Sequence, residues 1–256
     1  MNLIFRKILT LLFILILLPD VSAQEQKEEI FRKAVDNYSS GNYIDALRLW
    51  TDLYNTGYRS AELAYNIGNA CFKLDSIPGA ILFYERAYLL DPADEDINYN
   101  LQVARSRVTD KIEEIPELFF VKWFSFISLL LSSNTWARIS LAAFFLCLIF
   151  LSVFLYSSRY SYKVSGFWFA LSMIFISVMS FSFSVKNKSL VLDSRQAVIF
   201  SPIVSGKSSP DDSGNDLFVL HEGTKISVED AVGEWFEIRL SDGNKGWIPA
   251  KSVEII

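Results

Sequence analysis

Hydrophobic residues form two long uninterrupted runs in the second half of the chain. Ile139–Ser158 contains 20 residues without a charge, and Val164–Val185 contains 22. At about 1.5 Å of rise per residue, a helix of either length covers roughly 30 Å, the thickness of a bilayer's hydrocarbon core. The pattern therefore predicts two transmembrane helices, at 134–158 and 164–185, joined by a loop at 159–163.

A shorter apolar run, residues 117–133, precedes the first predicted span. It is rich in aromatic residues and also carries Lys122. Aromatic rings and lysine side chains are stable where lipid meets water, so we expect an amphipathic helix at the membrane interface. Between Leu118 and Lys188 there is no acidic residue, and the net charge of +6 favours contact with the lipid bilayer and its anionic headgroups.

The first 23 residues have the pattern of a secretory signal peptide. Arg6 and Lys7 precede the apolar run Ile8–Leu18, and Val21-Ser22-Ala23 supplies small residues for cleavage. An uncleaved anchor is the alternative. Export of residue 24 and two spans would place both soluble domains in the periplasm, with the loop 159–163 in the cytoplasm.

Residues 24–116 show a helical repeat. Ala46 and Ala80 are 34 residues apart, and Gly41–Ala46 aligns with Asp75–Ala80. This period resembles the tetratricopeptide repeat, in which small residues let paired helices approach closely; Gly68 is expected to do so here. A third copy begins at Glu95, and we expect it to continue as a capping helix to about Glu114.

Such repeats bind partner segments in a groove lined by their first helices, and the resemblance implies the same here. By register, seven residues are expected to line this groove: Phe31, Val35, Tyr38, Tyr65, Asn69, Phe72 and Tyr99. Most are aromatic or apolar, which favours an apolar or helical partner segment. A role in the core is the alternative for each of them.

From residue 186 to 256 the pattern changes to short β-rich runs separated by turn residues. Strands are expected at Ala197–Ile199, Leu217–Leu220, Thr224–Val228, Trp235–Leu240 and Gly246–Ile248, with a hairpin turn at Asp242-Gly243. The string Gly233–Ile238 with Gly246-Trp247-Ile248-Pro249 resembles a bacterial SH3-like domain. In that comparison Trp235 and Pro249 occupy positions of the ligand-binding face.

Charge and residue chemistry narrow the functional classes. The two soluble segments carry net charges of −7 and −5, so binding of nucleic acid is not expected. No metal site, cofactor site or catalytic constellation is recognisable. The only histidine, His221, is expected to be an exposed turn residue, and the two cysteines, Cys71 and Cys147, to be small buried hydrophobes. We therefore expect a non-enzymatic protein.

The whole arrangement predicts a multidomain membrane protein: α-helical tetratricopeptide hairpins, two transmembrane α-helices and a small SH3-like β-barrel. With Asn100–Val108 and the closing run Gly246–Ile256, it resembles the Bacteroides aerotolerance (Bat) operon family. That resemblance implies an inner (cytoplasmic) membrane complex with von Willebrand factor A-type Bat proteins and a MoxR-type ATPase, associated with oxidative or envelope stress.

Two functional hypotheses follow from different classes. The first is a membrane-anchored scaffold that binds a partner protein through the repeat groove. The second is a cell-wall sensor whose SH3-like domain binds peptidoglycan.

Overall fold

The computed structural model describes residues 21–113, 115, 118–192 and 195–256. Most of the predicted signal peptide therefore lies outside the described residues, and Val21–Ala23 form the start of helix α2 (Val21–Ser39). The chain divides into two compact units, the first ending at Arg59 and the second covering Ser60–Ile256.

The first unit is a pair of helices, α2 and α3 (Tyr43–Asn55), joined by a tight turn. Gly41 lies in this turn with φ +83°, a conformation that glycine adopts without strain. Trp50 is the largest buried side chain of the pair, at 1% exposed. The rings of Phe31 and Tyr38 pack against it, with centroids 6.3 and 5.7 Å away. Aromatic packing thus holds these two helices together.

Three more helices open the second unit: α4 (Ala61–Lys73), α5 (Ile77–Leu90) and α6 (Glu95–Ser106). The side chain of Ser60 caps α4, and that of Asp94 caps α6, by accepting hydrogen bonds from backbone N–H groups of the first turn. These polar caps fix where two of the helices begin.

Helices α4 and α5 pack very closely at one glycine. A Cβ atom added to Gly68 would lie 2.6 Å from the ring of Tyr84, so no larger residue fits without movement. The prediction that Gly68 allows close helix approach is confirmed. Ile67 and Ile81, both fully buried, extend this contact.

The third helix is shorter than the sequence suggests. Helix α6 ends at Ser106, so the expected continuation to about Glu114 is wrong. Residues 107–115, which we call the connector, are not helical where described. The carboxylate of Asp110 bonds instead to the hydroxyl of Thr224, just before β4, and the backbone N–H of Ile115 bonds to the carbonyl of Ser241 in the β5–β6 turn. These long-range hydrogen bonds outweigh the weak helix preference of a short polar segment.

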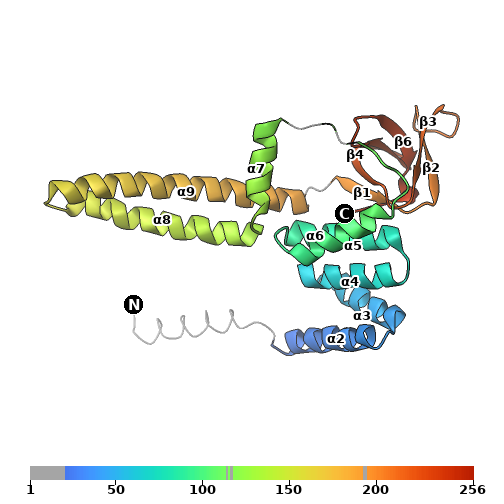
Figure 1. The fold of residues 1–256 in the computed structure, drawn as a ribbon, viewed down its shortest axis with the longest axis horizontal. Helices are drawn as coiled ribbons and strands as arrows, with labels where there is room; N and C mark the ends of the chain where they lie inside the picture. The colour runs from blue at the N-terminus through green and yellow to red at the C-terminus, as the bar shows by residue number, and fades with distance from the viewer. Residues whose placement is uncertain (1–20, 114, 116–117, 193–194) are drawn as a thin grey trace, which may run out of the picture. The chain divides into compact units, whose positions relative to one another are not determined.

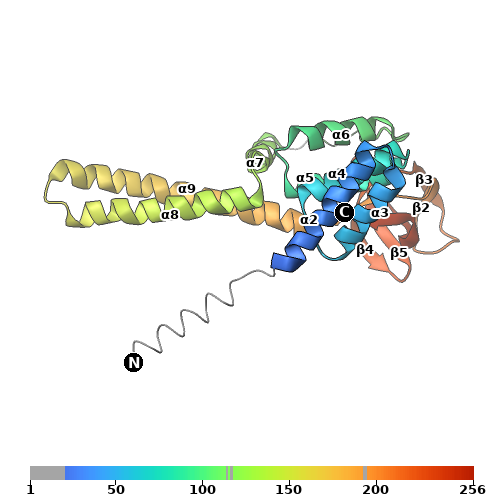
Figure 2. The same cartoon turned by 90° about the horizontal axis from the view of Figure 1, so that it is seen from below.

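The apolar region forms α7 (Phe119–Leu129), α8 (Ser133–Tyr156) and α9 (Tyr160–Leu192). Helices α8 and α9 lie side by side as an antiparallel hairpin in Figure 1 and in the turned view of Figure 2. Their most apolar windows have mean hydropathies of 2.6 and 1.9, and only 17% and 22% of those windows are buried. Both helices are long and apolar enough to cross a membrane. Helix α9, with 33 residues, extends beyond the predicted span 164–185 at both ends.

Serine residues connect α8 and α9. The hydroxyl of Ser140 donates to the carbonyl of Ser177, and the hydroxyl of Ser177 donates to the carbonyl of Ser140, both at 2.9 Å. Ser133 and Ser184 repeat this reciprocal pair at 2.9 and 3.0 Å. Polar groups between these apolar helices are therefore satisfied by the partner helix.

Helix α7 is attached to one end of this hairpin. The indole N–H of Trp136 and the amide of Asn187 both donate to the carbonyl of Ser128, at 2.8 and 2.6 Å. The ring of Phe124 packs on Phe183, with centroids 5.0 Å apart. The opposite side of α7 keeps large exposed residues: Phe119, Phe120, Trp123 and Phe126.

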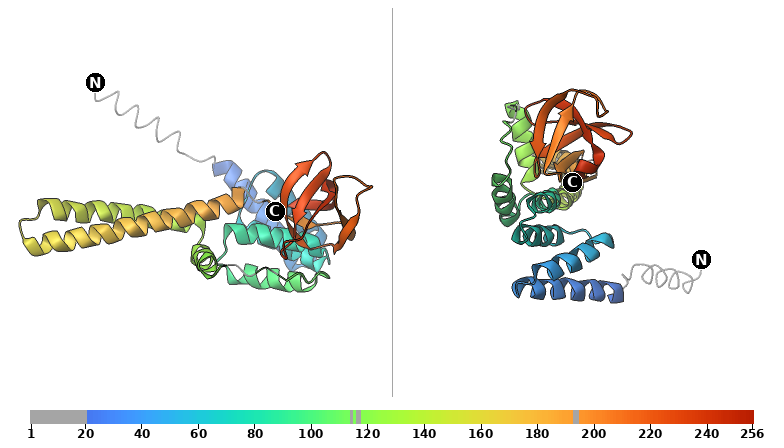
Figure 3. Two further views of the ribbon diagram at one scale, coloured as in Figure 1. Left: turned by 90° about the horizontal axis from the view of Figure 1, so that it is seen from above. Right: turned by 90° about the vertical axis from the view of Figure 1, so that its right-hand side faces the viewer.

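The C-terminal part is a seven-stranded antiparallel sheet with the order β3-β2-β6-β5-β4-β1-β7. Figure 3 shows that the strands form a curved sheet. The strands are β1 (Gln196–Ile199), β2 (Ile203–Lys207), β3 (Asp216–His221), β4 (Lys225–Val232), β5 (Trp235–Arg239), β6 (Lys245–Pro249) and β7 (Val253–Ile255).

The five expected strands correspond to β1, β3, β4, β5 and β6, and the hairpin at Asp242-Gly243 is confirmed by the pairing of β5 with β6. Strands β2 and β7 were not expected. The sequence of β2, Ile203–Lys207, contains Ser and Gly, and β7 has only three residues. Both are recruited by pairing with neighbouring strands, which local sequence does not reveal.

Candidate functional sites

Helices α5 and α6 contact the sheet through a buried carboxylate. Glu85 on α5 is 1% exposed. One of its oxygens accepts a hydrogen bond from Arg105 on α6, and the other accepts one from Nζ of Lys225 on β4 at 2.8 Å. One acidic side chain thus connects two helices to a strand 140 residues along the chain.

The two cations keep this carboxylate ionised. Burial by itself raises the pKa of Glu85, but the charges of Lys225 and Arg105 and their hydrogen bonds outweigh it, so the pKa lies below its usual value. Removing the cations would leave a charge in a site without water to solvate it.

A second polar contact joins the connector to the sheet. The carboxylate of Asp110 accepts hydrogen bonds from the hydroxyl of Thr224 at 2.6 Å and from the backbone N–H of His221 at 2.7 Å. Its other oxygen lies 2.7 Å from Nδ1 of His221. Burial raises the pKa of Asp110, but these hydrogen bonds lower it by more, so the net shift is downward.

The expectation that His221 is an exposed turn residue is therefore wrong. It is the last residue of β3, its side chain is 35% exposed, and Asp110 fixes its ring. Its position in a Leu-His-Glu-Gly sequence resembles a turn, but the acidic partner comes from a segment 111 residues away. An Asp–His pair can orient a general base, yet such a base also needs a nucleophile or substrate at its other nitrogen.

We call the two polar contacts together the junction; its residues are Glu85, Arg105, Asp110, His221, Thr224 and Lys225. Apolar side chains pack beside them. A Cβ atom added to Gly223 would lie 3.0 Å from Val108 and 3.3 Å from Ile81, so the loop before β4 lies directly on the connector and on α5. Ile112 of the connector packs on the core of the sheet. The junction therefore makes the helical part and the sheet one continuous body within the second unit.

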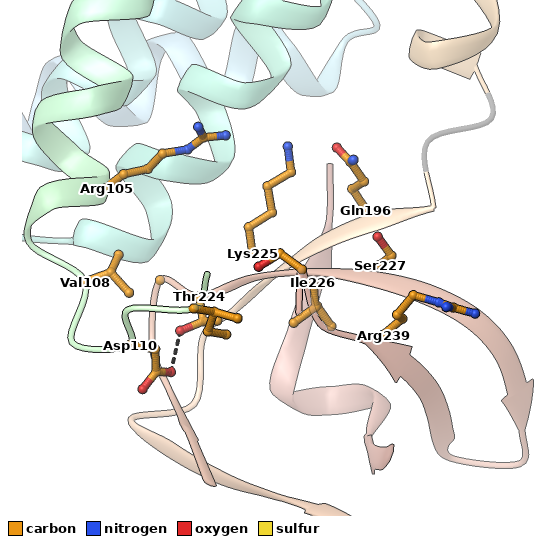
Figure 4. A pocket seen from close by; sticks show the side chains of 12 residues that line it. Arg105, Val108, Asp110, Gln196, Thr224, Lys225, Ile226, Ser227 and Arg239 are labelled. Atoms are coloured by element: carbon orange, nitrogen blue, oxygen red, sulfur yellow. Dashed lines mark hydrogen bonds between the residues drawn. The ribbon is translucent and has the colours of Figure 1, made fainter. Parts of the chain in front are cut away.

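A pocket of about 300 Å³ lies at the junction (Figure 4). Figure 4 shows Gln196, Lys225 and Ser227 projecting from the sheet toward the helices, with Arg105 facing them from α6. Arg239 lines the pocket at its far side. Sequence reasoning missed this site, because its residues come from α6, the connector and three strands and share no motif.

The predicted groove residues of the first unit have different surroundings. Phe31 and Tyr38 are half-buried against Trp50 and act in the packing of α2 on α3. Val35 is 38% exposed. Only Val35 of these three therefore keeps an exposed side chain.

In the second unit, two predicted groove residues belong to a hydrogen-bond network. The side-chain oxygen of Asn69 accepts from the hydroxyl of Tyr84 at 2.7 Å, and from the amide of Asn100 at 3.1 Å. The same amide donates to the hydroxyl of Tyr65 at 2.8 Å. Tyr65 and Asn69 thus hold α4, α5 and α6 together, and burial raises the pKa of Tyr65.

Phe72 and Tyr99 remain available at the surface. Tyr99 is 68% exposed, and Phe72 is half-buried with the guanidinium of Arg107 5.2 Å from its ring centroid. Of the predicted groove residues in this unit, Tyr99 is therefore the most exposed.

Trp235 and Pro249 are brought together by the sheet. They are directly opposite each other in the pairing of β5 with β6, and both are half-buried. The two residues therefore form an adjacent aromatic and proline pair on neighbouring strands.

Both cysteine thiols are free and buried. Cys71 is buried in α4, and burial raises its pKa to about 11, so it is almost entirely protonated near neutral pH. Cys147 is buried between α8 and α9. Among the described residues, no three His, Cys, Asp or Glu side chains gather as metal ligands.

The chain was compared with models of protein families and with curated proteins, and neither comparison gave a match.

Proposed function

We propose that this protein is a non-enzymatic, membrane-anchored scaffold in an envelope complex, and that it binds a partner protein through the exposed face of its helical repeats. The observation that supports this best is the junction. It joins helices α4 to α6, which precede the apolar hairpin, to the sheet that follows it, so both flanks of the proposed membrane anchor belong to one compact unit.

The case for membrane insertion comes from α8 and α9. Their surfaces are almost wholly apolar, and most of each helix is exposed, whereas a core helix of a soluble protein would be covered by the rest of the fold. A lipid bilayer supplies that cover. We place α7, with Phe119, Trp123 and Phe126 exposed, at the interface.

The hairpin also favours one topology. Because α8 and α9 are antiparallel, the chain enters and leaves the membrane on the same side. The hydrogen bonds of Glu85 with Lys225 and of Asp110 with Thr224 fit a proposal in which the helices and the sheet share one compartment. The signal-like segment 1–23 favours the periplasm. A C-terminal alkaline phosphatase fusion tests this orientation, because the enzyme is active only outside the cytoplasm. An inactive full-length fusion would show that the C-terminus lies in the cytoplasm and would contradict the proposed orientation.

The partner in this proposal is a membrane-bound von Willebrand factor A-type protein, as the resemblance to the Bat family implies. An apolar or helical segment suits the exposed ring of Tyr99 and the half-buried ring of Phe72. Tyr65 and Asn69, on the same helix as Phe72, are hydrogen-bonded to Asn100, the residue next to Tyr99 in the chain.

The test compares surface variants in native membranes. Phe72→Ala with Tyr99→Ala should reduce co-purification of the partner at least tenfold, because aromatic anchors dominate such contacts. Ile44→Ala, a substitution on α3 at a residue 72% exposed, is the matched control and should leave co-purification unchanged. Tyr65 is left intact because its loss would disturb the fold. If the folded double variant retains the partner in full, binding through this face is rejected.

Binding of peptidoglycan by the sheet is a second candidate function, because Trp235 and Pro249 lie adjacent on β5 and β6. Trp235→Ala should then release the full-length protein, in detergent micelles, from purified sacculi. A protein that never sediments with sacculi, with or without this substitution, would remove the sensor hypothesis.

A further inference from the structure

We propose that the pocket at the junction binds a small molecule carrying a carboxylate, such as the free C-terminus of a short peptide. This inference is independent of the scaffold proposal, because it concerns a ligand of the pocket and not a protein partner of the helices. It rests on the arrangement of cations around the pocket and on the elements that form its walls.

One wall of the pocket is a row of side chains across three strands. Gln196 on β1 pairs with Ser227 on β4, and Ser227 pairs with Arg239 on β5. Residues directly opposite each other in a sheet share one face, and Lys225, two positions before Ser227, shares it too. Polar groups from three strands therefore line one side of the cavity.

The opposite wall comes from α6 and the connector. Arg105 supplies a guanidinium there, and Val108 supplies apolar surface (Figure 4). The pocket thus combines several polar groups with apolar surface, and small-molecule sites occur preferentially where structural parts meet.

Basic side chains lie on both sides of the pocket: Arg105 comes from the helices, and Lys225 and Arg239 come from the sheet. Glu85 is shared between Arg105 and Lys225, which leaves one positive charge in excess. Glu229 is likewise shared between Arg239 and Lys245. Hydrogen bonds from Arg239 and Lys245 lower the pKa of Glu229 to about 2, so Glu229 stays ionised between these two cations.

The remaining acidic group at the pocket is already engaged. Both oxygens of Asp110 face donors, namely the Thr224 hydroxyl and the backbone and ring of His221. Arginine has five N–H donors, and Arg105 uses only its NH2 group in its hydrogen bond to Glu85. Its exposed portion, 46% of the side chain, can therefore bind an incoming carboxylate.

The size of the cavity limits the ligand. A volume of about 300 Å³ is at the lower end of the range for small-molecule sites, which excludes a folded segment and fits a molecule of roughly dipeptide size. Because its walls come from both the helices and the sheet, a bound ligand would bridge the junction and stabilise the second unit.

The test uses acetyl-alanyl-alanine as probe, with its C-terminal amide as the uncharged comparison, on the full-length chain in detergent micelles. Calorimetry should show binding of the acid at least tenfold tighter than that of the amide, since a hydrogen bond to a charged group accounts for about that factor. The acid should also raise the melting temperature, and its affinity should fall as salt increases.

Variants then locate the binding. Arg239→Gln removes a surface cation from the pocket and should weaken binding of the acid roughly fivefold to tenfold, consistent with loss of one charged contact. Lys251→Gln makes the same change in net charge at an exposed residue away from the pocket and should have no effect. Ser227→Phe fills the cavity and should abolish binding.

The proposal is overturned if the acid does not bind, if acid and amide bind equally, or if folded Arg239→Gln and Ser227→Phe variants bind the acid like the unmodified chain. Failure here leaves the scaffold proposal intact, because that proposal is tested by co-purification of a protein through Phe72 and Tyr99.

Discussion

The junction is held by charged side chains, whereas the α8–α9 hairpin is held by neutral hydroxyl groups. At the junction, Glu85 is buried, but the side chains of Arg105 and Lys225 are 46% and 29% exposed, so water still solvates the cations. In the hairpin, Ser140 and Ser177 bond to each other's backbone carbonyls. Charges need solvent or a partner, while hydroxyl groups can be satisfied between two helices in lipid.

This difference has consequences for mutation. Removing only the cations of a buried ion pair lowers the free energy of unfolding strongly, because the remaining charge stays buried without a partner. Removing one serine of a hydroxyl pair lowers the free energy of unfolding only slightly, because the remaining serine can form a hydrogen bond within its own helix. Four experiments test this contrast.

The largest effect is expected at Glu85. Arg105→Met with Lys225→Met leaves its carboxylate buried without a counter-charge and should lower the free energy of unfolding by about 3–5 kcal/mol. Adding Glu85→Met removes the stranded charge and should restore most of that loss. Denaturant unfolding of the full-length chain in micelles measures both. A triple variant as unstable as the double one would show that packing, and not charge, holds the junction.

A smaller loss is expected at Asp110. Asp110→Asn should cost about 1.5–3 kcal/mol near neutral pH, because hydrogen bonds to a charged acceptor are lost. Since the folded-state pKa of Asp110 is lowered, its contribution is complete above the unfolded pKa near 3.9 and is lost as the pH falls through the folded pKa. Melting temperatures of the two proteins should therefore converge at acidic pH. A difference that stays constant down to pH 3 would contradict this.

Close packing at the junction can be separated from backbone strain with two glycines. Gly223 and Gly233 both have positive φ, at +84° and +59°, so alanine is strained at either. Only at Gly223 would the added Cβ meet Val108 and Ile81. Gly223→Ala should therefore be less stable than Gly233→Ala by about 1 kcal/mol or more, measured by thermal unfolding. Equal stabilities would mean that the loop moves away easily.

The smallest effect is expected in the hairpin. Ser140→Ala should lower stability by about 0.6 kcal/mol, the average for hydrogen bonds between membrane helices. Ser152→Ala is the control, because its hydroxyl bonds only to Leu148 of its own helix. Unfolding in SDS measures both. A loss at Ser140 as large as that from the Arg105 and Lys225 double substitution would remove the contrast between the two regions.

The local pattern of hydrophobic and polar residues predicted much of the architecture. The runs Ile139–Ser158 and Val164–Val185 indicated two long apolar helices; α9 contains the second run, and α8 contains the first up to Tyr156. Alternation and turn residues located five of the seven strands, and Gly68 indicated the close contact of α4 with α5. These features depend on hydrophobic periodicity and on the positions of small residues, both of which can be identified from the sequence alone.

The end of α6 could not be found in the same way. A polar segment continuing after Ser106 has no stop signal. The helix ends because Asp110 bonds to Thr224, just before β4, and Ile115 bonds to Ser241 in the β5–β6 turn, both more than 100 residues later. The predicted groove residues also differ in burial because of contacts between helices that are distant in the sequence. Tyr65 and Asn69 are half-buried and hydrogen-bonded to Asn100, while Tyr99 is 68% exposed, although Tyr65 and Tyr99 are 34 residues apart and equivalent in the repeat pattern.

The sequence by itself determined the two long apolar helices and five of the seven strands, because those features depend on neighbours within a few residues. Only the tertiary structure decided that Glu85 receives Arg105 and Lys225, that His221 is fixed by Asp110, and that a pocket lies between them. A buried charge is stable only where counter-charges converge, and that convergence is a property of the folded chain in space.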